Sequence, residues 1–573
     1  MILMLCGALT ASAQTFSTLV SFNGTDGGRP DAPLIQATDG NFYGVTQNGG
    51  LTNQVCTTGG CGTVFKMTST GALTTLYQFC SLSNCADGAN PYGPLVQGTD
   101  GNFYGTTIYG GTNSNGTVFK ITSSGTLTTL HSFSLFSDGA YPWAGLIQAT
   151  DGNFYGTTTA GGIGIMGTLF KMTPAGALTP LHNFCNQSGC ADGANPYATL
   201  VQGTDGNLYG TTARGGNSSF NGTLFKSTTD GSLTTLYTFC SLSNCSDGMQ
   251  PFGPLVQATV GYFYGTTTSG QGQNSGTVFK ITSAGALTTL YTFCALSKCA
   301  DGVNPYGGVI QAYDGNFYGT TYIGGSGQGT VFEMTPSGKL TTLHTFDVQD
   351  GEAPWAGLLY ANDGNFYGTT EAGGANGKGT VFKLAGPVNR TLTVTVTGLG
   401  LVESVDGLIR CPSDCSWKYM DARTVVMGAI PNSGYSFTGW TGCDQVDGVY
   451  CWVTMTGAKN VTARFDAVSN ITLTSLTFKP AYVKGGRASA GTLTLSGSAP
   501  MGGLGISLSS DHPGVAHPPA FVIVPGGQSS VQFAAQTFPV KSKTVVTITA
   551  TAGASEVNGT LTVGTTSLPP AAK

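Results

Sequence analysis

The sequence predicts an all-β protein, most of it a β-propeller, and three observations carry this prediction. First, Thr, Val, Tyr and Phe are frequent and 88 of the 573 residues are Gly, which is typical of short strands joined by tight turns. Second, the segment DGNFYGTT at residues 100–107 recurs in near copies that start at residues 39, 151, 205, 314 and 363, with a degenerate copy, VGYFYGTT, at 260. Third, a segment GTVF or GTLF follows each copy. A period of about 50 residues with this composition indicates propeller blades.

Each repeat contains four strand-like segments. In the repeat that starts at residue 145 they are GLIQAT, NFYGTTT, GTLFKMT and ALTPLHNF. Asp151 and Gly152 join the first two segments as a tight hairpin turn, since Gly readily adopts the positive φ angles that such turns need. Four antiparallel strands in each repeat make one blade of a propeller.

The number of strands predicts how the ring closes. The fourth strand follows only six of the seven GTVF or GTLF segments, because the chain leaves the repeat pattern after Leu384. The missing copy lies at the other end, where FSTLVSF at residues 16–22 matches LTTLYQF at residues 73–79. Pairing the two ends would remove sheet edges that otherwise invite aggregation. We therefore expect a seven-bladed β-propeller over residues 15–386, closed by an N-terminal strand.

The repeats resemble the GloVer family, a glycine-rich repeat that occurs in tandem in secreted bacterial proteins. The resemblance rests on DGNFYGTT, GTVFK and LTTLYTF and covers about two thirds of the chain. It implies an exported protein and carries no particular molecular function with it.

Two small β domains are expected after the propeller. Residues 390–466 contain GYSFTGW and VTARF and look like the divergent internalin-type B repeat of bacterial surface proteins. Two local cysteine pairs, Cys411 with Cys415 and Cys443 with Cys451, would staple the thin core of a domain of this size. Residues 470–565 alternate polar and apolar residues, which fits an immunoglobulin-like sandwich, and residues 566–573 form a tail.

The first residues and the cysteines indicate an oxidising compartment. Residues 1–13 combine an apolar stretch with a small-residue cleavage site, as in a secretory signal peptide whose positive start is truncated; the alternative is a short buried strand. Fourteen further cysteines form seven local pairs that lie far apart from one another in the sequence, which favours disulfides over zinc sites. Besides the two pairs just named, they are Cys56 with Cys61, Cys80 with Cys85, Cys185 with Cys190, Cys240 with Cys245, and Cys294 with Cys299.

Composition argues against several classes of function. Charged residues make up 9% of the chain, the net charge is −5, and no basic run occurs, which argues against nucleic acid as a partner. No apolar stretch is long enough for a transmembrane helix. The motifs of serine hydrolases, phosphate-binding loops and zinc proteases are missing, and we expect neither a cofactor nor a metal site.

Candidates for catalysis are few. His131, His182 and His344 share a repeat position that holds Tyr or Val elsewhere, so we interpret it as a packing position. His512 and His517 lie in the segment DHPGVAHPP, where the alternatives are a pair of metal ligands and two loop histidines, and we favour the loop histidines.

Three acidic residues depart from the repeat pattern late in the ring, namely Glu333, Glu352 and Glu371. Three carboxylates within two blades would suit acid–base chemistry on a glycosidic bond. This is the basis of the alternative hypothesis, a carbohydrate-active enzyme with a propeller catalytic domain. It requires that the three side chains converge on the central channel.

The candidate binding residues fall on one face of the propeller. The links between blades vary in length, and variable loops on a rigid scaffold are where recognition usually lies. In these links the pattern DGxxP is followed by an aromatic residue in six of seven copies, and by Asp31 in the first. The aromatic residues are Tyr92, Trp143, Tyr197, Phe252, Tyr306 and Trp355.

Two interpretations of these aromatic residues remain open. They could be spacers packed between neighbouring blades, or platforms on which the C–H faces of a sugar stack, and Tyr and Trp can serve both roles. Together the features predict a secreted or cell-surface binding or adhesion protein without catalytic residues. Its loop face would bind a polysaccharide or a surface protein, and its C-terminal domains would act as spacers or anchoring units.

Overall fold

The computed structural model describes residues 15–565 except 53–55, 57–58, 218–219, 259–260, 271–274, 326, 388, 421–422, 469 and 501. The predicted signal peptide, the predicted tail and part of the degenerate repeat copy lie outside the described residues. The chain divides into two compact units, Met1–Pro387 and Val388–Lys573. The described residues contain no α-helix, and so none that is long and apolar enough to cross a membrane. Their short 3-10 segments are η1 (Ser83–Cys85), η2 (Ser188–Cys190), η3 (Ser243–Cys245) and η4 (Ser297–Cys299).

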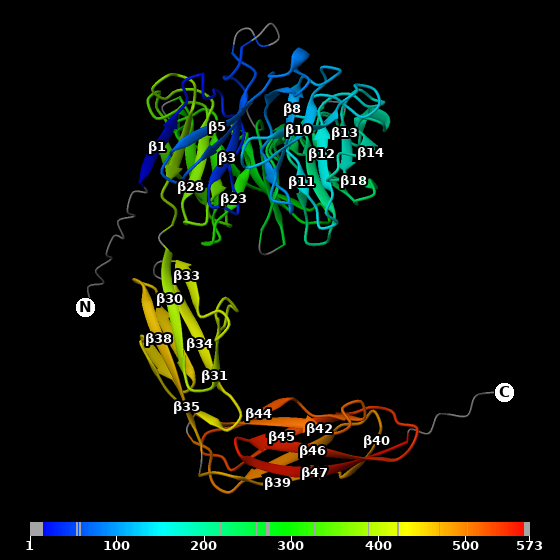
Figure 1. Ribbon diagram of the computed structural model, residues 1–573, viewed down its shortest axis with the longest axis vertical. Helices are drawn as coiled ribbons and strands as arrows, with labels where there is room; N and C mark the ends of the chain where they lie inside the picture. Colours follow the sequence, from blue (N-terminus) through cyan, green and yellow to red (C-terminus); the bar gives the residue numbers. More distant parts are fainter. Residues whose placement is uncertain are drawn as a thin grey trace, which may run out of the picture. The chain divides into compact units, whose positions relative to one another are not determined.

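The described part of the first unit contains seven antiparallel sheets, one for each repeat (Figure 1). The first sheet consists of β2 (Ile35–Gln36), β3 (Phe42–Thr46), β4 (Thr63–Met67) and β5 (Leu73–Gln78). The second consists of β6 (Ala89–Pro91), β7 (Val96–Gln97), β8 (Phe103–Tyr109), β9 (Thr117–Ile121) and β10 (Leu127–Ser132). The third consists of β11 (Ile147–Gln148), β12 (Phe154–Thr158), β13 (Thr168–Met172) and β14 (Leu178–Asn183).

The next three sheets repeat the same order of strands. The fourth consists of β15 (Val201–Gln202), β16 (Leu208–Thr212), β17 (Thr223–Ser227) and β18 (Leu233–Thr238). The fifth consists of β19 (Val256–Gln257), β20 (Phe263–Thr267), β21 (Thr277–Ile281) and β22 (Leu287–Thr292). The sixth consists of β23 (Val309–Gln311), β24 (Phe317–Thr321), β25 (Thr330–Met334) and β26 (Leu340–Thr345).

The seventh sheet combines the two ends of the repeat region. It consists of β27 (Leu359–Tyr360), β28 (Phe366–Thr370), β29 (Thr380–Leu384) and β1 (Phe16–Ser21). β1 runs antiparallel to β29, with Phe16 opposite Leu384 and Ser21 opposite Thr380. In Figure 1 the dark-blue β1 accordingly lies beside the yellow-green strands. The N-terminal segment is thus the fourth strand of the last sheet, as the count of strand segments predicts.

The turn at the start of each recurring segment is held by its Asp. In the second repeat Gly101 has a φ of 79°, which Gly adopts at little steric cost. Asp100 accepts hydrogen bonds from the backbone N–H of Asn102 (3.1 Å), the hydroxyl of Tyr104 (3.0 Å) and the ammonium group of Lys120 (2.8 Å). One carboxylate therefore ties together the turn, the second strand and the third strand of the sheet.

The aromatic residues of the same segment join neighbouring sheets. Tyr104 is fully buried, and its ring centroid lies 4.1 Å from that of Phe154 in the next repeat. The last repeat contacts the first through the same two positions, since the rings of Tyr367 and Phe42 lie 4.2 Å apart. Gly105 has no room for a side chain, because a Cβ there would meet the ring of Phe119 at 2.6 Å. The recurring residues thus serve turn formation and packing.

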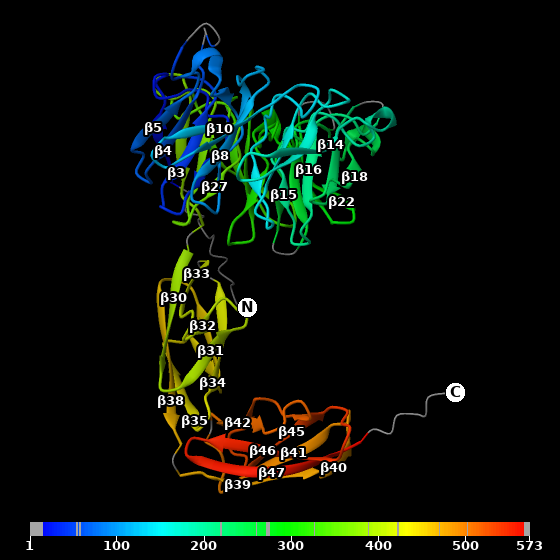
Figure 2. The same ribbon diagram turned by 45° about the vertical axis from the view of Figure 1, so that its right-hand side comes forward.

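The described part of the second unit contains two pairs of sheets (Figure 2). One sheet of the first pair is β33 (Ser416–Met420), β30 (Asn389–Thr397), β38 (Lys459–Ala467) and β35 (Tyr435–Thr441). The other is β32 (Arg410–Cys411), β31 (Gly400–Ser404), β34 (Thr424–Pro431), β37 (Tyr450–Thr454) and β36 (Gln445–Asp447). Phe437, Trp440 and Phe465, from the segments GYSFTGW and VTARF, belong to the buried cluster that these strands share.

The first pair of sheets carries two disulfides in its core. Cys411 is bonded to Cys415, and Cys443 is bonded to Cys451. Cys411 and Cys451 belong to the buried cluster, while Cys415 and Cys443 are partly buried against it. The two bridges therefore lie where the sequence predicts staples for a thin core.

The second pair of sheets has a core of its own. One sheet is β39 (Leu473–Lys479), β41 (Ser489–Leu495), β45 (Ser530–Thr537) and β43 (Ala516–His517). The other is β40 (Tyr482–Lys484), β47 (Ser555–Gly564), β46 (Thr544–Ala552), β42 (Leu504–Ser510) and β44 (Phe521–Val524). Leu493, Ile506, Val546 and Ile548 are fully buried within it.

Candidate binding site

The six aromatic residues that follow the DGxxP pattern line one cavity of about 210 Å³. Each side chain comes from a different repeat and is half-buried. Five of them also line a second cavity of about 210 Å³. The lining residues that the sequence predicts are Tyr92, Trp143, Tyr197, Phe252, Tyr306 and Trp355.

The six rings contact one another in a complete circle. The shortest contact is a stack of Tyr306 on Trp355, with centroids 3.8 Å apart and planes inclined by 13°. The other contacts have steeper angles, from 43° to 81°, and centroid distances from 4.5 to 6.2 Å. The rings therefore pack against each other at their edges and still border the cavity, so both roles weighed from the sequence remain physically compatible.

Asp31 holds the equivalent position in the first repeat and lines the same cavity. Its side chain is 0% exposed, and neither carboxylate oxygen has a hydrogen-bond partner. The nearest cation is Arg29, whose Nε lies 3.5 Å from Oδ2, further than the 2.7–2.9 Å of a charge-assisted hydrogen bond. Burial raises the pKa of Asp31 well above its ordinary value; Arg29 lowers it in part and Glu371 raises it further.

Arg29 is held by a second carboxylate next to the cavity. Its Nη2 lies 2.7 Å from Oε1 of Glu371. Burial raises the pKa of the neighbouring Tyr322 to about 12, and the negative charge of Glu371 contributes to the increase. Two carboxylates and one guanidinium thus meet beside a mostly apolar cavity.

The backbone of Arg29 shows that this position is constrained. Its φ is 51°, in the left-handed region, which Asn tolerates better than most residues. The equivalent positions in three other repeats are Asn90, Asn195 and Asn304, with φ between 52° and 54°. The amide of Asn90 donates to the carbonyl of Gln47 at 2.9 Å, whereas Arg29 pairs with a carboxylate instead. In the first repeat an ion pair of Arg29 with Glu371 thus stands where Asn90 of the second repeat donates a hydrogen bond to a backbone carbonyl.

Sequence reasoning did not identify Asp31, Arg29 or Tyr322 as site residues. The available signal was the loss of the aromatic residue in the first copy of the pattern. The role of Asp31 depends on Arg29 and on Glu371, which is distant in the sequence. Glu371 meets Arg29 only where the last sheet contacts the first.

The three glutamates that break the repeat pattern are not brought together. Glu333 lies in β25 and accepts a hydrogen bond from Nδ2 of Asn316 at 2.5 Å, beside the turn that opens the second strand. Glu333 thus lies near the start of β24, the second strand of its sheet. Glu371 follows the end of β28, which is the second strand of the last sheet. Glu352 forms a backbone bridge with Ala372. Among the described residues that line the aromatic cavity, Asp31 is the one carboxylate.

The histidines of the repeats occupy a hydrogen-bonding position, which the interpretation as packing residues overlooked. Nε2 of His131 lies 2.8 Å from Oδ2 of Asp138, the Asp that begins the DGxxP pattern. In another repeat the hydroxyl of Tyr77 donates to Asp87 at 2.8 Å. Tyr and His exchange at this position because both reach the same carboxylate. His512 is half-exposed beside Asp511, with Nδ1 at 2.9 Å from Oδ1.

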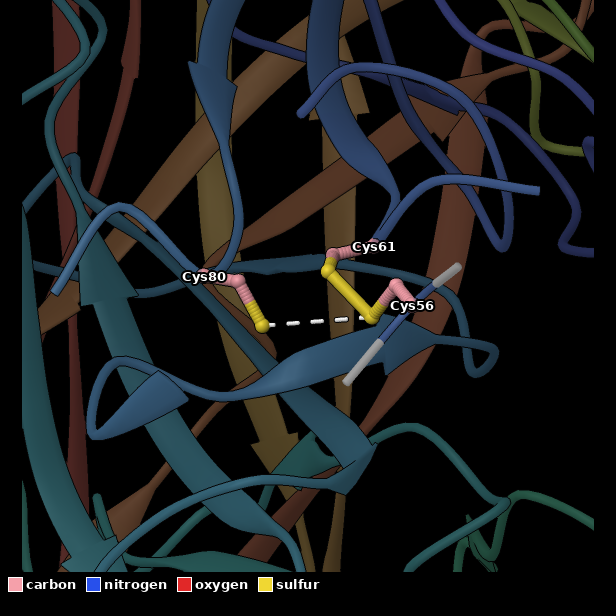
Figure 3. A group of neighbouring side chains, drawn as sticks. All are labelled: Cys56, Cys61 and Cys80. Atoms are coloured by element: carbon pink, nitrogen blue, oxygen red, sulfur yellow. Dashed lines mark hydrogen bonds between the residues drawn. A yellow bond between two sulfur atoms is a disulfide. The ribbon is translucent and has the colours of Figure 1, made fainter. Parts of the chain in front are cut away.

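The five cysteine pairs of the repeats are joined as the sequence predicts. Sγ of Cys80, which is bonded to Cys85, points at Sγ of Cys56 and lies 3.9 Å from it (Figure 3). Zinc binds the thiolate form of cysteine, so sulfurs that are paired in disulfides are not available as zinc ligands. The other bridges of the repeats join Cys56 to Cys61, Cys185 to Cys190, Cys240 to Cys245, and Cys294 to Cys299.

Comparisons with known proteins identify two families that match parts of the chain. The model of the Gloeobacter/Verrucomicrobia repeat matches residues 7–135, 51–246 and 240–398. The model of the divergent InlB B-repeat domain matches residues 391–469. No curated protein matches the chain.

Solved structures resemble the chain only distantly. Puromycin hydrolase is 12% identical with a TM-score of 0.40, over 77% of this chain and 67% of that one. The extracellular region of plexin A4 is 9% identical with a TM-score of 0.37, over 96% and 77%. Dipeptidyl peptidase 4 of Porphyromonas gingivalis is 9% identical with a TM-score of 0.32, over 78% and 72%. These scores are too low to support an argument about function. The family models cover most of the sequence, and the chain belongs to the Gloeobacter/Verrucomicrobia repeat family.

Proposed function

We propose that the protein is an exported, non-enzymatic binding protein whose seven sheets form a closed propeller and whose aromatic cavity holds a sugar ring of a glycan. The single observation that carries the binding role is the circle of six aromatic side chains around one cavity. Seven disulfides support an extracellular location, because such bonds persist in oxidising compartments.

Two contacts support a closed ring. β1 pairs with β29, so the last sheet has its full set of strands although the chain begins in it. Tyr367 of the last repeat packs on Phe42 of the first at 4.2 Å, as Tyr104 packs on Phe154. A closed ring would hold the six aromatic residues at fixed places on a rigid scaffold, and a rigid site loses little conformational entropy on binding.

The size and chemistry of the cavity favour a small part of a glycan. Its volume of about 210 Å³ lies below the ~300–1,000 Å³ of pockets for drug-sized ligands. One sugar ring or one chain end is therefore the expected occupant, rather than a long segment. Aromatic faces offer apolar contact to the C–H faces of such a ring, while the hydroxyl groups of Tyr and the N–H of Trp remain as polar tips.

The carboxylates favour binding over hydrolysis. Glycosidases generally use two carboxyl groups that flank the bond to be cleaved. In the described part of the chain the cavity is lined by one carboxylate, Asp31, and Glu333 lies with the turn at Asn316. The second carboxylate nearby, Glu371, pairs with Arg29 and does not line the cavity, which supports a binding role.

The test is a binding screen of the full chain on immobilised polysaccharides, followed by titration with Trp fluorescence. We expect Trp143→Ala and Trp355→Ala to weaken binding of the retained glycan at least tenfold, since each indole borders the cavity. Tyr109→Ala is the matched control, because Tyr109 is 46% exposed and lies outside that cavity. The proposal would be contradicted if the parent protein bound no glycan, or if both Trp variants bound the glycan as tightly as the parent does.

A further inference from the structure

We infer that the ligand of the aromatic cavity presents an ammonium group to Asp31. The inference deepens the proposed function, because an amino sugar of the glycan would supply this ammonium group. In this respect it rests on the proposed function. The same chemistry could come from an alkylammonium group that carries no sugar, and the experiment below separates the two sources.

The first argument is the isolation of Asp31. Buried polar groups in folded proteins are almost always hydrogen-bonded, and each exception requires an explanation. Both carboxylate oxygens of Asp31 are buried without a hydrogen-bond partner, and the residue lines the cavity. A ligand in the cavity that donates to these oxygens would supply the bonds that the protein itself does not.

The second argument decides between a charged donor and a neutral one. Nη2 of Arg29 pairs with Glu371 at 2.7 Å, whereas Nε, which has no hydrogen-bond partner, approaches Asp31 only to 3.5 Å. When all three groups are ionised, the cluster carries two negative charges and one positive charge. A sugar hydroxyl would provide a hydrogen bond and leave this imbalance, whereas an ammonium group would provide both the bond and the missing charge.

The aromatic circle gives the third argument. A cation above the face of Trp or Tyr is attracted by the negative face of the ring, and the attraction grows when water is excluded. Two Trp and three Tyr line this cavity together with one Phe. A cation held by Asp31 would therefore lie in surroundings that favour it for a second and independent reason.

The departures from the repeat pattern give the fourth argument. Asp31 stands where the other six copies have an aromatic residue. Arg29 stands before the Pro of the pattern, where all seven copies have a positive φ and three of them have Asn. Glu371 completes the set from the last repeat. The one copy of the pattern that lacks an aromatic residue thus has a buried carboxylate in its place, with the ion pair of Arg29 and Glu371 beside it.

The charge state of Asp31 provides a readout that a purely structural role would not move. Burial raises its pKa, and the groups that act on it are Arg29 and Glu371; Asp31 in turn contributes to raising the pKa of Tyr92. A bound cation favours the ionised carboxylate, so binding should release a proton. The affinity for a cation without a titratable proton should then increase as pH rises through the raised pKa of Asp31.

The experiment titrates the full chain with four probes, followed by calorimetry and Trp fluorescence. The probes are glucosamine oligomers, N-acetylglucosamine oligomers, glucose oligomers of the same length, and tetramethylammonium ion. We expect the glucosamine oligomer to bind at least tenfold more tightly than the two neutral oligomers, and tetramethylammonium to compete with it. Asp31→Asn should abolish this preference, and Asp230→Asn, which removes an exposed carboxylate, should retain it.

The outcomes separate the two proposals. If neutral oligomers bind as tightly as the amino sugar, or if Asp31→Asn retains the preference, the inference is wrong and glycan binding stands. If tetramethylammonium binds with dependence on Asp31 and pH while no oligosaccharide binds, the ammonium inference holds and the glycan function is wrong. If none of the four probes binds the parent protein, both are wrong.

Discussion

Phe16 stacks on His344, with ring centroids 3.6 Å apart and planes inclined by only 4°. Phe16 begins β1 in the seventh sheet, and His344 lies in β26 of the sixth. The N-terminal strand therefore does more than complete its own sheet, since it also packs on the neighbouring one. Nε2 of His344 is at the same time 2.8 Å from Oδ2 of Asp350, which fixes the ring that Phe16 covers.

Deleting residues 15–23 should cause aggregation or a large loss of stability. The deletion would leave β29 as an exposed edge with a row of unpaired backbone groups, which other chains can pair with. Thermal melting and light scattering measure both effects. Phe16→Ala should give a milder loss, and Phe136→Ala is its control because that side chain is 71% exposed. A deletion variant that melts like the parent would contradict the structural role of β1.

Trp143→Ala should cost less stability than Phe154→Ala. Phe154 is fully buried between sheets, and removal of such a side chain typically costs ~3–5 kcal/mol. Trp143 is half-buried beside the cavity, so part of its surface already faces the space that a ligand would fill. Urea unfolding of the two variants gives the comparison. Equal losses would mean that Trp143 is an interior packing residue and would remove a contact of the proposed binding site.

The architecture was predictable because its determinants are local and repeated. Asp100, Gly101 and Tyr104 lie in one hairpin, and Lys120, which Asp100 also binds, belongs to the same repeat, so their pattern in the sequence reports their structure directly. The role of β1 followed from a missing strand segment at one end and an extra one at the other. The circle of aromatic residues was predictable for the same reason, since each member follows the same DGxxP pattern.

The polar part of the site was not predictable, because it depends on residues that are far apart in sequence. Arg29 and Glu371 form an ion pair where the first and last sheets meet, and no periodicity indicates such a contact. Glu333 and Glu371 differ for a simpler reason. They lie at opposite ends of equivalent sheets, so closeness in the sequence did not mean closeness in space.

Asp31→Asn should raise the melting temperature of the empty protein at neutral pH. The pKa of Asp31 is raised above its unfolded value of about 3.9. The protonated carboxyl of Asp31 therefore contributes its full stabilisation at pH values below the unfolded pKa. This stabilisation is lost as pH rises through the folded pKa. Asn removes the titration, so the gain should be largest at pH 7 and should disappear near pH 4. A lower melting temperature at pH 7, with Asp230→Asn unchanged, would show that Asp31 stabilises the fold.

The Asp residues of the recurring turns should make the protein sensitive to acid. Burial alone would raise the pKa of Asp100, but hydrogen bonds from Lys120, Asn102 and Tyr104 outweigh it and hold the pKa well below its ordinary value. Three equivalent turns behave in the same way, those of Asp39, Asp151 and Asp205. A carboxylate whose pKa is lower in the folded state than in the unfolded state stabilises the fold at pH values above its unfolded pKa. This stabilisation is lost as pH falls below about 4.

The measurement is the melting temperature between pH 5 and pH 2. We expect a steep decrease below about pH 4 in the parent and a shallower one in Asp100→Asn, which cannot lose the charge. Each turn contributes little, because these carboxylates are largely exposed and solvent screens them. A melting temperature independent of pH in this range would contradict the role of the turns.

The cysteines should form local disulfides in the purified protein. Peptide mapping without reduction should recover Cys56 joined to Cys61 and Cys80 joined to Cys85, although Sγ of Cys56 and Sγ of Cys80 lie only 3.9 Å apart. A bridge between residues five positions apart removes little freedom from the unfolded chain, about 2 kcal/mol by the chain-entropy model. Replacing Cys240 and Cys245 together by Ser should therefore lower stability by no more than about that amount.

The corresponding control is reduction of the parent protein with dithiothreitol, which should lower the melting temperature further because it opens all the bridges at once. Recovery of a peptide that joins Cys56 to Cys80 would show that the neighbouring pairs exchange partners in solution. Free thiols in the folded protein, or zinc bound in stoichiometric amount, would contradict the disulfides, since a thiolate that ligates zinc cannot also be part of a disulfide.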